Sequence, residues 1–236
     1  MIFKTAVIIA GGKGERLGDI GEGLPKPLVK VEGKPILERI ILWLKKNGVE
    51  KIVIGVAYKK EMIKDYFGNG NRLGVKIIYT EHDENGGTED AFRTAIEKSK
   101  IDDENFYALN GDQITDLQLE GVTNKHLVSH ATVTMITTNL RTNFGIVQID
   151  DKNRIANLKE KGEVKGLLIN TGIYVFNKKI KNYLVGGNIE EKAFRKLIEE
   201  KNMISFYYDG LWTSFNDKKE LAVAEKAIRE FSGLID

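Results

Sequence analysis

Short, continuously apolar segments alternate with helix-like segments through the first half of the chain. The apolar segments are rich in β-branched residues, and strands are expected at residues 5–10, 51–57, 75–79 and 106–109. Apolar residues recur at helical spacing between them, and helices are expected at 35–47, 60–67 and 88–99, the last capped by Thr88. Such alternation joins parallel strands by helices, and strands without a polar face are covered on both sides. The pattern predicts an α/β fold with a mainly parallel sheet covered by helices.

The second half of the chain, from about residue 131, has more strand-like segments. Strands are expected at 131–137, 145–149, 154–158 and 167–176, with a hairpin turn at 150–153. Helices are expected at 189–199 and 218–231. No internal repeat, low-complexity tract or linker divides the sequence. We therefore expect one domain over residues 1–236, with a first half at about 1–130 and a smaller, strand-rich half at about 131–236.

Composition excludes several classes of protein. The 236 residues carry a net charge of +2 with acids and bases interspersed, whereas a nucleic-acid-binding surface needs a basic face. The chain has no cysteine, which excludes disulfides, thiolate nucleophiles and cysteine-ligated zinc. Residues 1–10 lack the features of a signal peptide, and no apolar stretch approaches the ~20 residues of a membrane span. We expect a cytoplasmic protein with no nucleic-acid or membrane partner.

A glycine-rich loop directly follows the first expected strand. Gly11, Gly12 and Gly14 let backbone N–H groups approach an anion, and Arg16 can grip phosphate oxygens as a two-pronged donor. The spacing matches neither the dinucleotide fingerprint nor the P-loop. The loop is a candidate phosphate cradle, although a tight turn without a ligand explains the glycines alone equally well.

Lys26 stands between two of the three prolines in the chain, Pro25 and Pro27. Each proline fixes its own φ and biases the residue before it toward extended geometry. A lysine held on a stiff segment loses less entropy when it contacts a phosphate. Lys26 is therefore a candidate phosphate ligand, and a solvated loop lysine is the alternative.

These segments, taken in order, resemble the sugar-1-phosphate nucleotidyltransferases, or NDP-sugar pyrophosphorylases. The similar segments are AGGKGERL at 10–17, PKPL at 25–28, GKP at 33–35, YFG at 66–68, GT at 87–88, NGD at 110–112, EK at 160–161 and NTGIY at 170–174. The resemblance implies a Rossmann-like nucleotidyltransferase fold. It also implies transfer of a nucleoside monophosphate from an NTP to a sugar 1-phosphate, with release of pyrophosphate.

The same resemblance implies roles for individual residues. Catalytic roles fall on Arg16, Lys26 and Asp112. Nucleotide contacts are expected at Ala10, Gly11, Gly12, Gly14, Glu81, His82, Gly87, Thr88 and Gly111. Sugar contacts are expected at Gly145, Glu160, Lys161 and Asn170. The first half of the chain becomes the nucleotide-binding half and the second the sugar-binding half. We expect no C-terminal β-helix domain. Assembly into a homo-oligomer is possible, and the sequence does not decide the oligomeric state.

Asp112 ends an apolar strand, at the edge where open α/β sheets bind ligands. Bringing two phosphate-bearing anions together needs a hard cation, and Mg²⁺ held by one or two carboxylates meets that need. Asp116 is a possible helper, and a turn aspartate is the alternative reading of Asp112. Relatives have Trp-x-Asp-Ile/Val-Gly-Thr near the end, where this chain has Ser214 in place of the aspartate. Asp217 is the candidate second metal ligand, with Asp209 as a substitute.

The base and the sugar stay open at this point. Glu81 can accept hydrogen bonds from guanine, which favours guanine as the base, whereas His82 can contact a pyrimidine instead, and a solvated acidic loop is an equal alternative. Glu89 and Asp90 would repel phosphates unless they point away from the nucleotide. Candidate products are GDP-mannose, a GDP-heptose, and dTDP- or UDP-glucose. A phosphocholine-type cytidylyltransferase and a weakly active regulatory homologue that binds nucleotide sugars are the alternatives, the latter because of Ser214.

Overall fold

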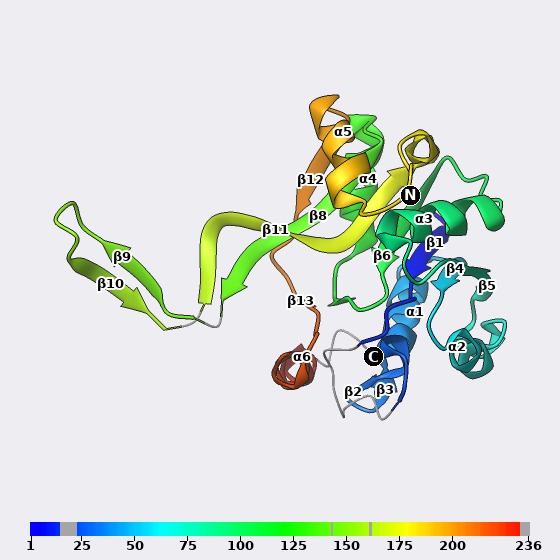
Figure 1. Cartoon of the computed structure of the whole chain (residues 1–236), viewed down its shortest axis with the longest axis horizontal. Helices are drawn as coiled ribbons and strands as arrows, with labels where there is room; N and C mark the ends of the chain where they lie inside the picture. Colours follow the sequence, from blue (N-terminus) through cyan, green and yellow to red (C-terminus); the bar gives the residue numbers. More distant parts are fainter. Residues whose placement is uncertain (15–22, 143, 161, 232–236) are drawn as a thin grey trace.

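The computed structural model describes residues 1–14, 23–142, 144–160 and 162–231, and it is built on a seven-stranded sheet. The order across the sheet is β12-β8-β11-β6-β1-β4-β5 (Figure 1). The bounds are β1 (Thr5–Ile9), β4 (Lys51–Val56), β5 (Lys76–Glu81), β6 (Asn105–Asn110), β8 (Val133–Thr142), β11 (Gly162–Asn177) and β12 (Met203–Tyr207). Neighbours are parallel from β6 through β1 and β4 to β5, whereas β11 runs antiparallel to β6 and β8. The predicted α/β class is confirmed, and both halves of the chain contribute strands to one sheet.

Helices cover both faces of this sheet. They are α1 (Ile36–Lys46), α2 (Lys60–Phe67), α3 (Gly87–Lys98), α4 (Leu119–Ser129), α5 (Arg195–Glu199) and α6 (Lys218–Phe231). Ala6 and Ile8 of β1 belong to the buried cluster that includes residues of α1, α2, α4 and α6, whereas Val7 belongs to the cluster that includes residues of α3 and α5. Successive strand residues point to opposite faces, so a strand buried on both faces reads as a continuous apolar run.

Short elements complete the chain. The two-residue strands are β2 (Lys30–Val31), β3 (Lys34–Pro35), β7 (Ile114–Thr115) and β13 (Trp212–Thr213). The short helical turns are η2 (Lys26–Leu28), η3 (Asn71–Leu73), η4 (Lys178–Asn182) and η5 (Glu190–Phe194). Within the described ranges, no helix is both long and apolar enough to cross a bilayer.

Several expected boundaries differ from the structure. The helix expected at 88–99 begins at Gly87, and its N-cap residue is Gly86. The prediction that Thr88 caps this helix was therefore wrong. The Thr88 hydroxyl instead accepts a hydrogen bond from the backbone of Ile189 at 3.2 Å. The helix expected at 189–199 is divided into the π-helical turn η5 and the short helix α5. Neither α4 nor β12 was predicted.

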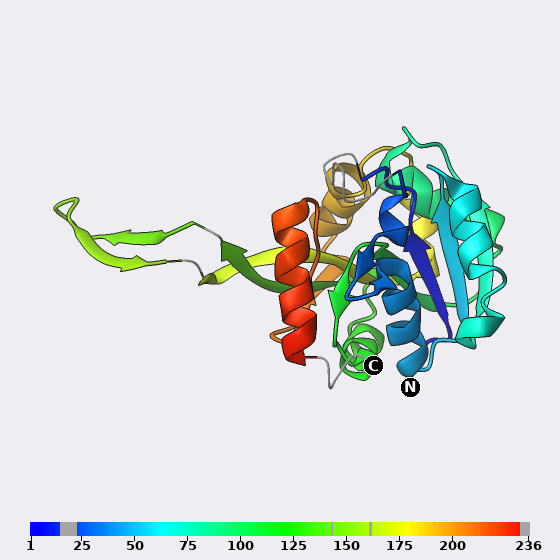
Figure 2. The ribbon, with the colours of Figure 1, turned by 90° about the horizontal axis from the view of Figure 1, so that it is seen from below.

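A two-stranded arm extends from the body of the molecule. It consists of β9 (Ile146–Ile149) and β10 (Ile155–Lys159), and in two perpendicular views it lies clear of the other elements (Figures 1 and 2). The predicted turn at 150–153 is confirmed, because Asp150 accepts hydrogen bonds from the backbone N–H groups of Lys152 and Arg154.

His126 on α4 is buried, with only 2% of its surface exposed. Its ring nitrogens lie 2.8 Å from the Thr134 hydroxyl and 3.0 Å from the Asn105 amide oxygen. Burial lowers the pKa of His126 from its ordinary 6.5 to about 4, because the charged imidazolium is poorly solvated there.

We expect this burial to make the protein less stable in mild acid. The unfolded chain takes up a proton at His126 near pH 6.5, and the folded chain does so only near pH 4, so the free energy of unfolding falls between these values by roughly 2 kcal/mol. Urea denaturation at pH 7 and pH 5 measures this loss. A His126→Gln variant keeps hydrogen-bonding groups but does not titrate, and its loss is expected to be smaller. Equal losses in the two proteins would contradict the assignment.

Candidate active site

A pocket of about 220 Å³ lies beyond the carboxyl ends of β1 and β6. These strands are parallel neighbours, with Ile9 opposite Asn110, so the residues that follow them enter the pocket side by side. The lining residues are Ile9, Ala10, Gly12, Lys26, Pro27, Thr88, Asn110, Gly111 and Asp112. The structure thus brings six of the sequence-predicted site residues together: Ala10, Gly12, Lys26, Thr88, Gly111 and Asp112.

Gly111 fits this place because β1 and the loop after β6 approach each other closely. Its N–H donates to the carbonyl of Ile9 at 2.8 Å. A Cβ atom at Gly111 would lie 2.8 Å from that carbonyl oxygen and 3.2 Å from the Cα of Ala10. Any larger residue would push the two strand ends apart, so the glycine sets the width of the pocket floor.

Lys26 and Asp112 form an ion pair inside the pocket. The Lys26 Nζ lies 2.6 Å from Asp112 Oδ2 and 3.2 Å from Asn216 Oδ1. It also lies 5.5 Å from the centre of the Phe215 ring. The Lys26 side chain is 11% exposed and that of Asp112 is 26% exposed. One cation position is thus surrounded by a carboxylate, an amide oxygen and an aromatic ring, all largely shielded from solvent.

Gln113 and Asn216 contact this pair, and the sequence reasoning missed both. The Gln113 side-chain N–H donates to Asp112 Oδ1, which leaves the carboxylate held on both oxygens. Gln113 is 7% exposed, and its own amide oxygen has no hydrogen-bond partner among the described residues. Asn216 stands where the relatives' pattern has glycine, which has no side chain, so the pattern gave no reason to expect a contact. The one sequence feature that could have indicated Gln113 is its position next to Asp112.

His82 packs against the glycine-rich loop. A Cβ on Gly11 would lie 2.5 Å from His82 Nε2, so only glycine allows the ring this close. His82 Nδ1 lies 3.0 Å from the carbonyl oxygen of Asp83, while Nε2 is buried with no hydrogen-bond partner in the described part of the chain. The structure therefore places two predicted nucleotide contacts, Gly11 and His82, against each other. Gly14 is the last described residue of the loop, and Arg16 lies outside the described residues.

Glu81 has a different environment. Its carboxylate lies 2.5 Å from the Lys60 ammonium and 2.7 Å from that of Lys64, both on α2. These hydrogen bonds to Lys60 and Lys64 lower the pKa of Glu81 to about 2. The Glu81 carboxylate, which was expected to contact the base, is therefore already paired with two lysines of α2.

Glu89 and Asp90 at the start of α3 do not line the described pocket. The Glu89 carboxylate is fully buried and accepts hydrogen bonds from the backbone N–H groups of Val185 and Gly186. Asp90 pairs with Arg93 one turn along the same helix. Both carboxylates are thus already bound by groups of the protein. The start of α3, at Gly87, is joined instead to the loop before η5.

The expected sugar contacts are divided between two places. Asn170 on β11 donates to the Tyr174 hydroxyl at 2.8 Å and accepts from the Gly172 N–H at 2.9 Å. Gly145 and Glu160 are exposed at the base of the arm and do not line the described pocket. Lys161 lies outside the described residues.

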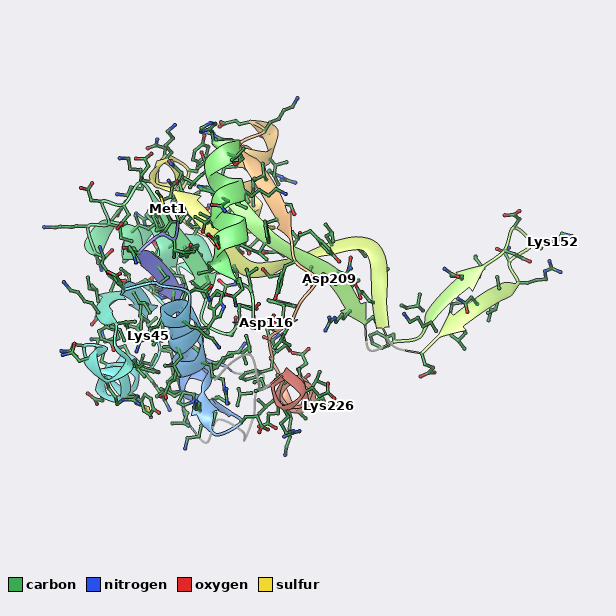
Figure 3. All side chains as sticks on the ribbon, turned by 180° about the vertical axis from the view of Figure 1, so that it is seen from behind. Met1, Lys45, Asp116, Lys152, Asp209 and Lys226 are labelled. Carbon is green, nitrogen blue, oxygen red and sulfur yellow. The ribbon has the colours of Figure 1, made fainter. Side chains whose placement is uncertain are left out.

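The expected metal ligands are divided as well. Asp217 is positioned as the cap of α6, because its Oδ1 accepts from the backbone N–H groups of Lys219 and Glu220 at 2.8 and 2.9 Å. Asp116 accepts from the backbone N–H of Leu211 at 2.9 Å and from the Tyr208 hydroxyl, beside β13 (Figure 3). Within the described ranges, no three His, Asp or Glu side chains are grouped as a ready metal site. A metal role for Asp217 stays a prediction.

A second hollow has a volume of about 270 Å³. Arg141, Trp212, Ser214 and Asn216 are among its lining residues. The Trp212 indole N–H donates to the carbonyl of Thr171 at 3.0 Å, which fixes the turn that carries Ser214. The Lys26 Nζ of the first pocket lies 3.2 Å from the Asn216 Oδ1 of the second hollow, although the two hollows share no lining residue.

A glycine turn, a lysine and a carboxylate at the ends of adjacent parallel strands are typical of α/β proteins that bind phosphorylated nucleotides. A family model described as nucleotidyl transferase matches residues 5–212. The bifunctional protein GlmU of Methanocaldococcus jannaschii is 38% identical over 229 residues, which are 94% of this chain and 53% of that protein. The D-glycero-alpha-D-manno-heptose 1-phosphate guanylyltransferase of Campylobacter jejuni is 35% identical and covers 83% of this chain and 85% of its own length. The chain belongs to the nucleotidyl transferase family, among the sugar-1-phosphate nucleotidyltransferases.

A solved structure supports the fold. HddC from Yersinia pseudotuberculosis, complexed with GMP-PN, superposes with a TM-score of 0.72 at 24% identity, over 97% of this chain and 100% of that one. The predicted Rossmann-like nucleotidyltransferase fold is thereby confirmed. The chain spans about half the length of the GlmU proteins and of the glucose-1-phosphate uridylyltransferase that it matches.

Proposed function

We propose that the chain transfers a nucleoside monophosphate from an NTP to a sugar 1-phosphate, producing an NDP-sugar and pyrophosphate. The carrying observation is the Lys26–Asp112 pair, held at 2.6 Å in the pocket where β1 and β6 end. The relatives' names support the same reaction class. We place the reaction in the cytoplasm, where nucleoside triphosphates are available.

In this proposal catalysis is positioning and charge neutralisation. A sugar phosphate oxygen attacks the α-phosphorus of the triphosphate, a new P–O bond forms, and the bond to the departing pyrophosphate breaks. The attacking oxygen is already ionised, so no protein nucleophile is needed. The backbone of Gly11 and Gly12 and the charges of Arg16 and Lys26 bind the phosphates, and Asp112 orients Lys26 before substrate arrives.

We propose Mg²⁺ as the cofactor. Asp112 and Asn216 direct oxygens at one cation position, now held by the Lys26 ammonium, and Mg²⁺ prefers such oxygen ligands together with substrate phosphates and waters. The ion supplies neutralisation of the phosphate charge when bound. Asp217 stays a candidate second ligand that is supported less, because its carboxylate caps α6. Asn170, Gly145, Glu160 and Lys161 stay candidate sugar contacts.

We propose that His82 reads the base. Glu81 is bound to two lysines of α2, whereas His82 Nε2 lies against Gly11 and has no described partner. An imidazole nitrogen can serve as donor or acceptor to the edge of a pyrimidine. This contact does not select one base, so guanine, uracil and thymine all stay candidates.

Pyrophosphate release tests the proposal. We expect release only when one of the triphosphates ATP, CTP, GTP, UTP or dTTP is combined with a sugar 1-phosphate and Mg²⁺, and the triphosphate with the highest rate identifies the base. Phosphocholine with CTP serves as the control for the cytidylyltransferase alternative. A protein that binds nucleotide sugars but releases no pyrophosphate with any pair would be a regulatory homologue, the reading that Ser214 motivates.

A further inference from the structure

The arm formed by β9 and β10 has one apolar face. Val147 pairs with Leu158 and Ile149 pairs with Ile155 across the two strands. Directly opposed residues of antiparallel strands share a face, and so do residues two apart on one strand. A register shift between Ile155 and Asn157 changes the parity of β10, and this shift puts Ile155 on the same side as Leu158. We call these four side chains the arm face.

The opposite side of the arm carries polar side chains beside Ile146. Gln148 pairs with Asn157 there, and the Asn157 amide donates to the Gln148 side-chain oxygen at 3.2 Å. Lys159 follows on the same side, opposite Ile146. The arm is therefore amphipathic in the manner of a sheet that is wet on one side and covered on the other.

No described part of the body covers the arm face. Exposure is 50% for Val147, 63% for Ile149, 69% for Ile155 and 58% for Leu158, and Phe144 at the base of the arm is 81% exposed. An isolated two-stranded ribbon is at best marginally stable in water, and a contiguous apolar patch on a projecting element marks a contact surface. The arm therefore needs a cover for its four aliphatic side chains.

The charges of the arm allow a second copy of the chain to supply that cover. Asp150 is paired with Arg154 at 2.7 Å, and Asp151 is followed directly by Lys152 at the tip, which Figure 3 shows at the far end of the arm. The tip has no net charge, and the whole chain carries only +2, so two arms do not repel each other. A basic stripe, which nucleic acid would need, is absent from residues 146–159.

The layout of the arm face is self-complementary. Its two cross-strand pairs form two successive apolar layers, so a twofold rotation stacks the Val147–Leu158 layer of one arm on the Ile149–Ile155 layer of the other. Complete burial of the exposed parts of these four side chains and of Phe144 in two copies amounts to on the order of 1,200 Å², the lower end of specific interfaces. We propose that the chain forms a twofold dimer in which the arm faces of two copies pack against each other.

Site-directed cross-linking tests this contact, because the chain has no cysteine of its own. Ile149→Cys places a thiol on the arm face, and Gln148→Cys places one on the neighbouring residue of the polar face. A short bifunctional thiol reagent is expected to convert most of the first variant to a covalent dimer and to leave the second at the level of chance collisions. Equal cross-linking of the two variants would overturn the proposal.

Light scattering of uncross-linked protein gives an independent readout. At about 50 µM the natural chain is expected at twice its 26.5 kDa mass. The double variant Val147→Glu with Leu158→Glu is expected at the single mass, because it buries charges in the contact. The matched variant Gln148→Glu with Asn157→Glu keeps the dimer. A monomeric natural chain, or a dimeric Val147→Glu, Leu158→Glu variant with unchanged circular dichroism, would show that something other than a second arm covers the face.

Discussion

Replacing Asp112 with asparagine is expected to lower kcat roughly 10²–10³-fold, the loss typical when one preorganised charged contact is removed from an active site. Asp112 is the one acidic side chain among the described residues that line the pocket. Its two oxygens contact Lys26 and Gln113, so the substitution removes a charge and leaves the neighbouring groups in place. Pyrophosphate release at several Mg²⁺ concentrations measures the effect, and we expect the Mg²⁺ dependence to shift to higher concentration as well.

Asp116→Asn is the matched control for this prediction. Asp116 lies four residues along the chain, but its carboxylate binds the Leu211 N–H and the Tyr208 hydroxyl and does not line the pocket. That variant is expected to lose stability while keeping kcat within a few-fold of the natural value. Turnover near the natural rate in a folded Asp112→Asn protein would reject the role proposed for this carboxylate.

The parallel part of the sheet was predictable because burial on both faces leaves a simple signal. In β1, Val7 contacts the core under α3 while Ala6 and Ile8 contact the opposite core, and the result is an unbroken apolar run. The glycines of the site were predictable for a related reason. At Gly11 and Gly111 a neighbouring ring or backbone would lie within about 3 Å of an added Cβ atom. Glycine is therefore the one residue type that fits at these positions.

Elements stabilised by polar contacts were not predictable in this way. In α4 the buried residues include two polar side chains, Thr123 and His126, so the helix lacks a fully apolar face. Their burial is compensated by hydrogen bonds to Tyr107, Thr134 and Asn105, which lie on strands β6 and β8. The strand β12 at the sheet edge is only half-buried and lacks a continuous apolar run.

The sequence predicted which residues belong to the candidate site better than it predicted which groups those residues contact. The order of the motifs indicated Lys26 and Asp112 separately, but nothing in the sequence reports that their charged groups meet 2.6 Å apart. Glu81 was expected at the base from the resemblance to relatives, whereas α2 supplies two lysines that bind it. Asp217 had a competing signal, since an aspartate just before a helical segment is a typical cap.

Replacing Glu89 with alanine is expected to lower the free energy of unfolding by about 3 kcal/mol, because hydrogen bonds to a buried charged group are lost together. The carboxylate is fully buried and accepts from the N–H groups of Val185 and Gly186, with Ala193 N at 3.4 Å. Its own N–H donates to the Gly187 carbonyl at 3.0 Å. Glu89 thus fastens the start of α3 to a loop from the other half of the chain.

The same substitution is expected to raise KM for the nucleoside triphosphate several-fold, since Thr88 lines the pocket and its hydroxyl is bound to Ile189 of that loop. Asp90→Ala is the control, because Asp90 is the next acid in the helix and pairs only with Arg93 among the described residues. Its cost is expected below about 1 kcal/mol, with little change in KM. Denaturation curves and nucleotide titrations of the two variants decide the matter: equal stability and equal KM would mean that Glu89 does not couple the two halves of the chain.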